Sequence, residues 1–295
     1  MDERFRMTKW FATLLYRLLA LVLLTIVGGF LAATLVRYSP GYGTDERELD
    51  PRLSQTSMQW IRSQHQQNSN LIHYYSEYLR AAAHGDFGNS ESLHRPIAQL
   101  LAERFRVTLR SVSLAVLVAW SAAFALATLS WLSGGWLFDL SCTLVTGFLL
   151  SLPAAIVALL FVYLRAPVFL AIAVVLFPKL FRFIHNLLSH ASEQPHVLAA
   201  KARGIGRSRI FVRHMLAPAI ATLVALLGTS TSLGFGTAVP IEALCDSAGI
   251  GQLAWFAAIN RDLPLIMNLT LVVTLITVAC NSLADYSSKL IARQI

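Results

Sequence analysis

The residues whose types and spacing could carry chemistry do not form a catalytic or nucleotide-binding motif in this chain of 295 residues. None of its four lysines, at positions 9, 179, 201 and 289, follows a glycine, so the sequence lacks the Gly-Lys-Ser/Thr loop that cradles nucleotide phosphates. His-Glu-x-x-His, Cys-x-x-Cys and Gly-x-Ser-x-Gly motifs are also absent. The cysteines lack metal-ligand spacing and are expected to be unpaired thiols: Cys142, Cys245 and Cys280. The remaining chemistry depends on where charges, glycines and hydroxyl groups lie.

Basic residues gather in one segment, from Lys179 to His214, which contains seven lysines and arginines and a single acid, Glu193. In a membrane protein a short loop with this bias stays in the cytoplasm. The pattern predicts a helix over 192–202, a turn at Gly204 and Gly206, and a second helix over 207–216. The charge by itself is explained by a solvated loop whose single function is to set the membrane topology. Setting topology does not require the small residues at 199, 200 and 202 or the glycine pair, so these residues indicate a further function.

The composition indicates that the helices on either side of this basic segment lie in a lipid bilayer. The chain is 56% hydrophobic and 14% charged, with mean hydropathy +0.58, and a soluble core of this size cannot bury so much apolar surface. Of its 24 lysines and arginines, four lie in residues 1–17, seven in the basic segment and two near the carboxyl end. Because membrane topology explains the net charge of +8, nucleic acid is excluded as a partner.

Apolar runs predict an all-α polytopic membrane protein with six transmembrane helices and both termini in the cytoplasm. Pro153 is expected to kink the third span, and Lys179 and Arg182 are expected to reach the inner interface from the end of the fourth. The chain divides into a cytoplasmic segment with the first span (1–36), a periplasmic region (37–110) and a five-helix core (111–295) containing the loop 190–214. The expected spans are Leu18–Val36, Ser111–Phe138, Leu140–Leu164, Ala166–Ile184, Ala219–Val239 and Leu263–Leu283.

Two polar stripes cross the last two spans. In the fifth, small residues recur every four positions, which allows another helix to approach closely. In the sixth, hydroxyl, amide and carboxyl groups share one helical face that should point into the protein or into a pore. Packing inside the chain and contact with a second subunit or a solute both remain open for these stripes: Gly228, Ser232 and Gly236, then Thr270, Thr274, Thr277, Asn281 and Asp285.

The order of several short motifs resembles the permeases of binding-protein-dependent ABC importers, most closely the oligopeptide/dipeptide branch. Ala199-Ala200, followed by Gly204 and Arg213-His214-Met215-Leu216, is similar to that family's cytoplasmic EAA loop. Gly85-Asp86-Phe87-Gly88 and the Glu242, Gly249-x-Gly251 and Arg261-Asp262 series are similar to its exported segments.

The resemblance implies a type I ABC-importer permease fold and a role as half of the pore for di- or oligopeptides. It implies three sets of functional residues. The ATPase-coupling set is Ala199, Ala200, Lys201, Gly204, Arg209 and Arg213; the periplasmic gate or binding-protein set is Glu242, Asp246, Gly249, Gly251 and Asp262; the pore or packing set is Gly228, Ser232, Gly236, Thr277 and Asn281.

By the same resemblance, the protein lies in a bacterial inner membrane and is a non-catalytic subunit. Its partners would be a second homologous permease, two ATP-binding subunits and an extracytoplasmic solute-binding protein. ATP and Mg would bind those partners, and this chain would hold no cofactor or metal. One alternative is an importer of another small solute such as a nickel chelate. Another is a secondary carrier, but such carriers usually have internal repeats and charges at mid-membrane, and neither is expected here. A non-transporting membrane scaffold is the third.

Overall fold

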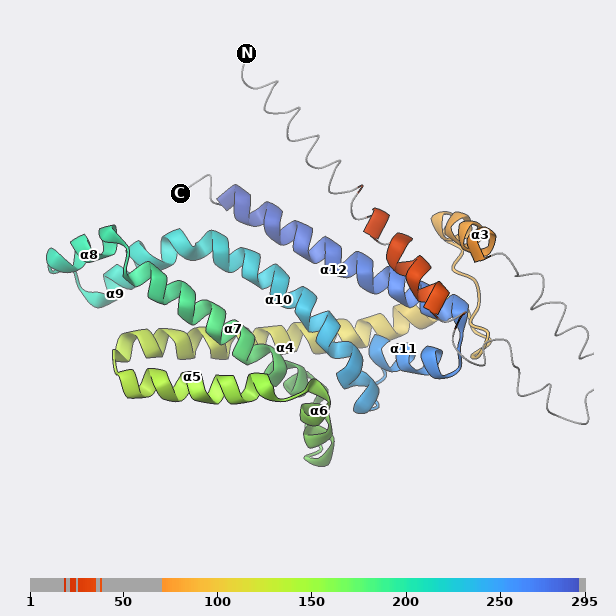
Figure 1. Ribbon diagram of the computed structural model, residues 1–295, viewed down its shortest axis with the longest axis horizontal. Coiled ribbons are helices and arrows are strands. Elements are labelled where there is room, and N and C mark those ends of the chain that lie inside the picture. The colour runs from red at the N-terminus through yellow and green to blue at the C-terminus, as the bar shows by residue number, and fades with distance from the viewer. Residues whose placement is uncertain (1–18, 20–21, 25, 36–37, 39–70, 292–295) are drawn as a thin grey trace, which may run out of the picture. The chain divides into compact units, whose positions relative to one another are not determined.

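The computed structural model describes residues 19, 22–24, 26–35, 38 and 71–291, and every regular element from residue 71 onward is helical (Figure 1). The predicted all-α class is therefore confirmed. The helices are α3 (Leu71–Ala83), α4 (Ile97–Ser133), α5 (Trp136–Ser151), α6 (Ala154–Tyr163), α7 (Val168–Ser192), α8 (Pro195–Ala202), α9 (Arg207–Arg209), the π-helical η2 (Ile210–Leu216), α10 (Ala217–Leu244), α11 (Ile250–Ile259) and α12 (Leu263–Ile291).

Among the described residues, four helices are long and apolar enough to cross a membrane, or up to five if the bent pair α5 and α6 is one span. The predicted first span, Leu18–Val36, lies partly outside the described residues. Its described part includes an apolar helix, Val22–Leu35, which is shorter than the other spans. The count of six spans stays a prediction.

Pro153 breaks the third span, so the prediction of a simple kink was wrong. The axes of α5 and α6 differ by 93°. Leu152 and Pro153 are both extended, with ψ of 123° and 140°, and Pro153 stands directly before the first residue of α6. Proline lacks an N–H to continue the helix and disfavours a helical conformation in the residue before it. The turn therefore sends the short apolar α6 away from α5 instead of extending it.

The fourth span is longer than predicted, because α7 continues to Ser192 and accommodates Pro178 in its interior. Lys179 consequently lies near the middle of α7, eleven residues after Val168, and not at the end of the span. The helix predicted over 192–202 is also interrupted. A new helix, α8, begins at Pro195, since proline is favoured in the first helical turn.

The chain contains two compact parts. One comprises residues 1–103 and 254–274, and its described core packs Tyr75 of α3 against Ala33, Leu263 and Met267. The Tyr75 hydroxyl donates a 2.7 Å hydrogen bond to the carbonyl oxygen of Ile26.

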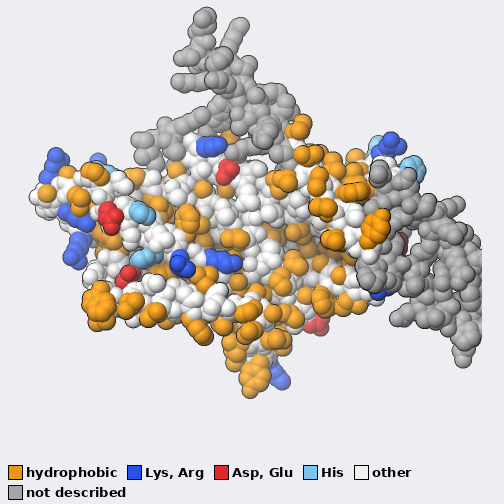
Figure 2. Space-filling model, viewed as in Figure 1, with side chains coloured by type: hydrophobic (Ala, Val, Ile, Leu, Met, Phe, Trp, Pro, Cys, Tyr) orange, Lys and Arg blue, Asp and Glu red, His pale blue; other side chains and the backbone are white. Residues whose placement is uncertain are grey.

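The other part comprises residues 104–253 and 275–295. In it α7 packs against both α5 and α10, with Leu176, Phe181 and Ile184 of α7 fully buried (Figure 1). Hydrophobic side chains remain exposed along α5 and α6 (Figure 2), including Phe148 and Tyr163. Such a surface suits lipid or another apolar subunit.

Candidate functional site

The glycine turn predicted in the basic segment is confirmed. Gly204 has φ of +74°, a left-handed conformation that strains other residues, and it follows the last turn of α8. The Ile205 N–H donates to the Ala200 carbonyl at 3.2 Å and the Gly204 N–H to that of Lys201 at 3.0 Å. Gly206 differs, since its φ of −60° is open to any residue. The position that requires glycine is therefore 204.

Helix α8 buries one face and presents the other. Val197 and Ala200 are buried, whereas Ala199 and Lys201 are exposed. Leu198 is 51% exposed and adds an apolar side chain to the outer face. Of the predicted coupling residues, Ala200 holds α8 in place, and five lie on the surface: Ala199, Lys201, Gly204, Arg209 and Arg213. The exposed face combines small and apolar side chains with a basic margin, which suits an acidic protein surface.

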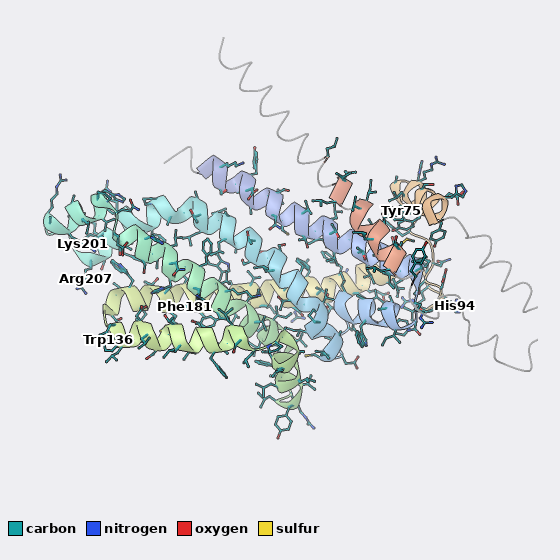
Figure 3. The ribbon with its side chains drawn as sticks, in the orientation of Figure 1. Tyr75, His94, Trp136, Phe181, Lys201 and Arg207 are labelled. Atoms are coloured by element: carbon teal, nitrogen blue, oxygen red, sulfur yellow. The ribbon has the colours of Figure 1, made fainter. Side chains whose placement is uncertain are left out.

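Two cations of the basic segment contact the ends of the spans. Arg207 donates to the Leu132 carbonyl in the last turn of α4, and Lys201 donates to the Ser192 carbonyl that ends α7, each at 3.4 Å. Cations are favoured at helix carboxyl ends because the unpaired carbonyls carry partial negative charge. Figure 3 shows both side chains at the end of the bundle where α5 begins with Trp136. Lys201 and Arg207 also line a polar groove of about 440 Å³.

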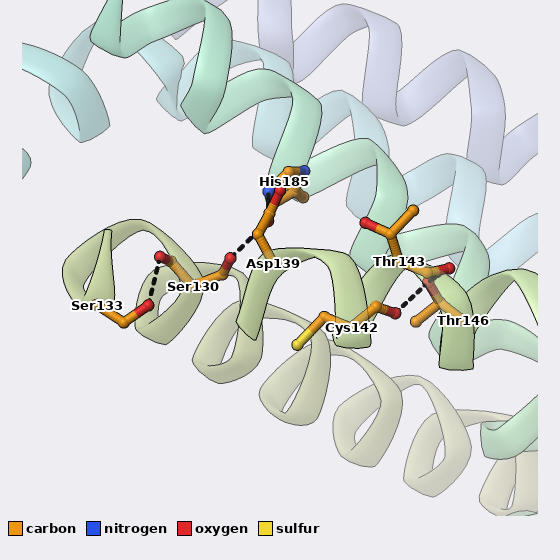
Figure 4. Close-up of polar contacts among 7 residues, drawn as sticks. All are labelled: Ser130, Ser133, Asp139, Cys142, Thr143, Thr146 and His185. Atoms are coloured by element: carbon orange, nitrogen blue, oxygen red, sulfur yellow. Dashed lines mark hydrogen bonds and ion pairs between the residues drawn. The ribbon is translucent and has the colours of Figure 1, made fainter. Parts of the chain in front are cut away.

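An acid that sequence reasoning missed joins three helices near this segment (Figure 4). Asp139 of α5 accepts a 2.7 Å hydrogen bond from the Ser130 hydroxyl of α4 and pairs with His185 Nε2 of α7, also at 2.7 Å. Asp139 is the single acid between residues 104 and 192, and that isolation was an available signal. The contact ties α7 to α4 and α5 just before α8.

A second polar centre surrounds Glu242, whose side chain is fully buried near the end of α10. Its Oε2 accepts hydrogen bonds from the Thr108 hydroxyl and from the Gly251 N–H, both at 2.9 Å. The Ile250 N–H donates to the Thr108 hydroxyl oxygen at 2.8 Å. Glu242 and Thr108 thus satisfy the first amides of α11, where negative charge is favoured by the helix dipole.

This centre explains the Gly-x-Gly motif. A Cβ at Gly249 would overlap the Glu242 carboxylate, and a Cβ at Gly251 would overlap the backbone of Val239. Neither glycine has positive φ, so close approach and not turn geometry requires them. Sequence analysis identified this motif in a segment expected to be exported, and in the structure it lies between the end of α10 at Leu244 and the first turn of α11, which starts at Ile250.

Asp262, in the other compact part of the chain, resembles Glu242 in that its buried carboxylate accepts hydrogen bonds at the start of a helix. One oxygen accepts bonds from the hydroxyls of Ser90 and Ser92 at 2.5 and 2.6 Å, and the other accepts from the Leu265 N–H at 3.1 Å. Asp262 therefore caps α12 and holds the segment after the Gly85–Gly88 turn. Of the predicted binding-protein set, only Asp246 has an exposed side chain, and it pairs with Gln252. Contact with a binding protein stays a prediction for this set.

The small-residue stripe of α10 divides between two environments. A Cβ at Gly228 would overlap Ala284 of α12, and the Asn281 amide donates a 3.3 Å bond to the Ser232 hydroxyl. Gly236 is exposed, and a Cβ there would meet nothing within 4 Å. Gly228, Ser232 and Asn281 therefore form a helix seam inside the chain, whereas Gly236 faces outward. Thr277 of α12 is half-buried.

Residues 106–295 match the family described as the binding-protein-dependent transport system inner membrane component. The chain is similar to the nickel import system permease protein NikB of Staphylococcus aureus (strain bovine RF122 / ET3-1), with 23% identity over 95% of this chain and 90% of that protein. It is 26% identical to the oligopeptide transport system permease protein OppB of Escherichia coli (strain K12), over 81% of this chain and 84% of OppB. A putative peptide permease protein of Brucella suis biovar 1 (strain 1330) is 24% identical, over 93% of each chain.

Proposed function

Because this chain belongs to the family of binding-protein-dependent transport system inner membrane components, we propose that it forms half of the translocation pore of an ATP-driven importer of di- or oligopeptides. Proteins of this family are membrane permease components of ABC importers, and ATP hydrolysis lies in separate subunits. The proposal adds a second permease, two ATP-binding subunits and an extracytoplasmic solute-binding protein. It places the protein in the inner membrane with both termini in the cytoplasm.

The basic segment and its attachments carry this proposal. Its exposed face suits an acidic partner surface, and Gly204 holds the turn in a conformation that other residues resist. Lys201 and Arg207 connect the segment to the ends of α7 and α4, and Asp139 joins both helices to α5. A displacement of the segment by ATPase closure would therefore move these helices together and change which side of the pore is open.

Peptides are the favoured solute because two of the three similar proteins described above carry peptide transport in their names. A nickel chelate is the second candidate, and it is favoured by the similarity to NikB over 95% of the chain. A secondary carrier is disfavoured because the family uses ATP on partner subunits.

The test is uptake by the complex that co-purifies with this chain, reconstituted in liposomes with its binding protein. We expect uptake of radiolabelled tri-alanine that needs ATP and stops when the ATP-binding subunits are omitted. Nickel–histidine uptake without tri-alanine uptake would select the second candidate. Uptake of either solute by this chain alone, driven by an ion gradient, would contradict the importer mechanism.

A further inference from the structure

Two cations occupy the middle of a helix that is apolar enough to cross a membrane. Lys179 lies eleven residues after the start of α7 and thirteen before its end, or about 16 and 20 Å at the helical rise. Arg182 follows almost one turn later. Both side chains are exposed in this chain, and basic side chains appear over α7 in Figure 2. Both cations therefore lie inside a candidate membrane span and not beyond its end.

Neither cation has a hydrogen-bond or ion-pair partner within the part of the chain that the structure describes. Asp139, the acid on the adjacent α5, is already bonded to Ser130 and His185. A lysine or arginine that faces lipid inside a membrane span is costly, and such residues normally face a water-filled path or an opposite charge. The exposed side of α7 at Lys179 therefore faces something other than lipid.

A cavity of about 260 Å³ adjoins Lys179 between α7 and α10. Its walls are mostly apolar, with Leu176 and Phe183 from α7, and the α10 side adds the hydroxyls of Thr222 and Thr229. Gly236 lies seven residues beyond Thr229 and shares its exposed side of α10. This face therefore combines one adjacent cation, hydroxyl groups, apolar walls and a glycine with open space, which suits a small solute carrying an anionic group on an apolar body.

We propose that Lys179, assisted by Arg182, receives the carboxylate of the transported solute on the α7–α10 face. The inference rests on the proposed function and adds a substrate chemistry to it: the solute carries a free carboxylate, as a peptide with an unmodified carboxyl end does. The flexible lysine stem lets the ammonium group follow a moving carboxylate, and weak contacts along the face allow release. The alternative occupant is an acidic side chain of the second permease.

The test compares two probes in the complete reconstituted transporter, tri-alanine and tri-alanine amide. The binding protein's preference between the two probes is the same for every permease variant. A change in the ratio of the two uptake rates therefore reports the effect of the permease substitution alone. Lys179→Gln should lower tri-alanine uptake about tenfold, as expected for loss of a charged hydrogen bond, and change amide uptake less than about twofold. Lys179→Arg should retain uptake of both. Lys289→Gln, at an exposed lysine near the end of α12, is the matched control and should change neither.

A second measurement does not depend on delivery of the amide. In a transporter whose native cysteines are replaced, Lys179→Cys should lose tri-alanine uptake. A reagent that attaches an aminoethyl group to the thiol should restore much of it, and one that attaches a sulfonatoethyl group should not. Equal behaviour with both reagents would overturn the inference.

Other outcomes separate the two proposals. Equal losses for both probes in Lys179→Gln, or unchanged uptake of both, overturn this inference and leave the importer function intact. Loss of the second permease from the purified Lys179→Gln complex would assign the cation to subunit pairing and also overturn it. Absence of wild-type uptake of both probes would overturn the peptide function together with this inference.

Discussion

The seam between α10 and α12 leads to a prediction about Gly228. Replacing Gly228 with alanine places a methyl group over the Ala284 Cβ and 3.0 Å from the Cys280 carbonyl oxygen. Nonbonded carbons pack at about 3.5–4.0 Å, so α12 has to retreat by more than about 1 Å. That movement would also lengthen the bond from Asn281 to Ser232, which already measures 3.3 Å.

The expected magnitude combines two opposing effects. Overpacking typically costs about 1–3 kcal/mol, and a weakened buried hydrogen bond adds about 1 kcal/mol. Replacing glycine with alanine inside a helix returns up to about 1 kcal/mol. Gly228→Ala should therefore lower the free energy of unfolding by about 1–3 kcal/mol. Gly236→Ala, on the same helix with open space around it, should be neutral or stabilising.

Thermal stability of the detergent-extracted chain, followed by fluorescence-detected size exclusion, measures this difference. We expect Gly228→Ala to melt several degrees below the wild type, at roughly 2–4 °C per kcal/mol. Adding Ala284→Gly removes the overlapping methyl group and should recover most of the loss. If Gly228→Ala melts together with Gly236→Ala, or if Ala284→Gly makes it worse, α10 and α12 do not pack as described.

Three further results are expected. Gly204→Ala should leave membrane abundance unchanged but lower binding-protein-stimulated ATP hydrolysis several-fold, because the positive φ adds about 1–2 kcal/mol of strain to the turn. Gly206→Ala should preserve the ATP hydrolysis rate. Equal rates in the two variants would show that the turn only sets topology. Burial raises the pKa of the Cys245 thiol, and the thiolate is the reactive form. Maleimide labelling should therefore be slow at pH 7 and rise about tenfold per pH unit to a higher pH than for an exposed thiol; a rise that levels off in the range of an exposed thiol would contradict the burial. Glu242→Ala should lower the melting temperature by roughly 5–10 °C, because the Thr108 hydroxyl of α4 and the Gly251 N–H of α11 lose their acceptor at about 1–3 kcal/mol each. Glu242→Gln keeps an acceptor and should cost much less, and equal shifts in the melting temperature would refute this capping role.

Sequence alone determined the class of the protein and much of its helical plan. Apolar runs became helices because lipid offers no partners for backbone groups, which leaves helices as the spanning structure for such segments. Gly204 forms the predicted turn, and Gly134-Gly135 separates α4 from α5. These outcomes depend on neighbours within a few residues, so local chemistry was sufficient to predict them.

Tertiary packing decided which residues meet. Thr108 and Glu242 are 134 positions apart, and no local pattern indicates that their contact begins α11 and requires Gly249. Gly228 and Gly236 have the same spacing from Ser232, yet a Cβ at Gly228 would overlap Ala284 of α12, whereas a Cβ at Gly236 would meet nothing within 4 Å. Lys179 looked like the start of a cytoplasmic loop because charge usually marks the end of a span. Its place in the middle of α7 follows from how far that helix continues, and burial of Ile184 and Leu188 against the core is what keeps it helical beyond the charge.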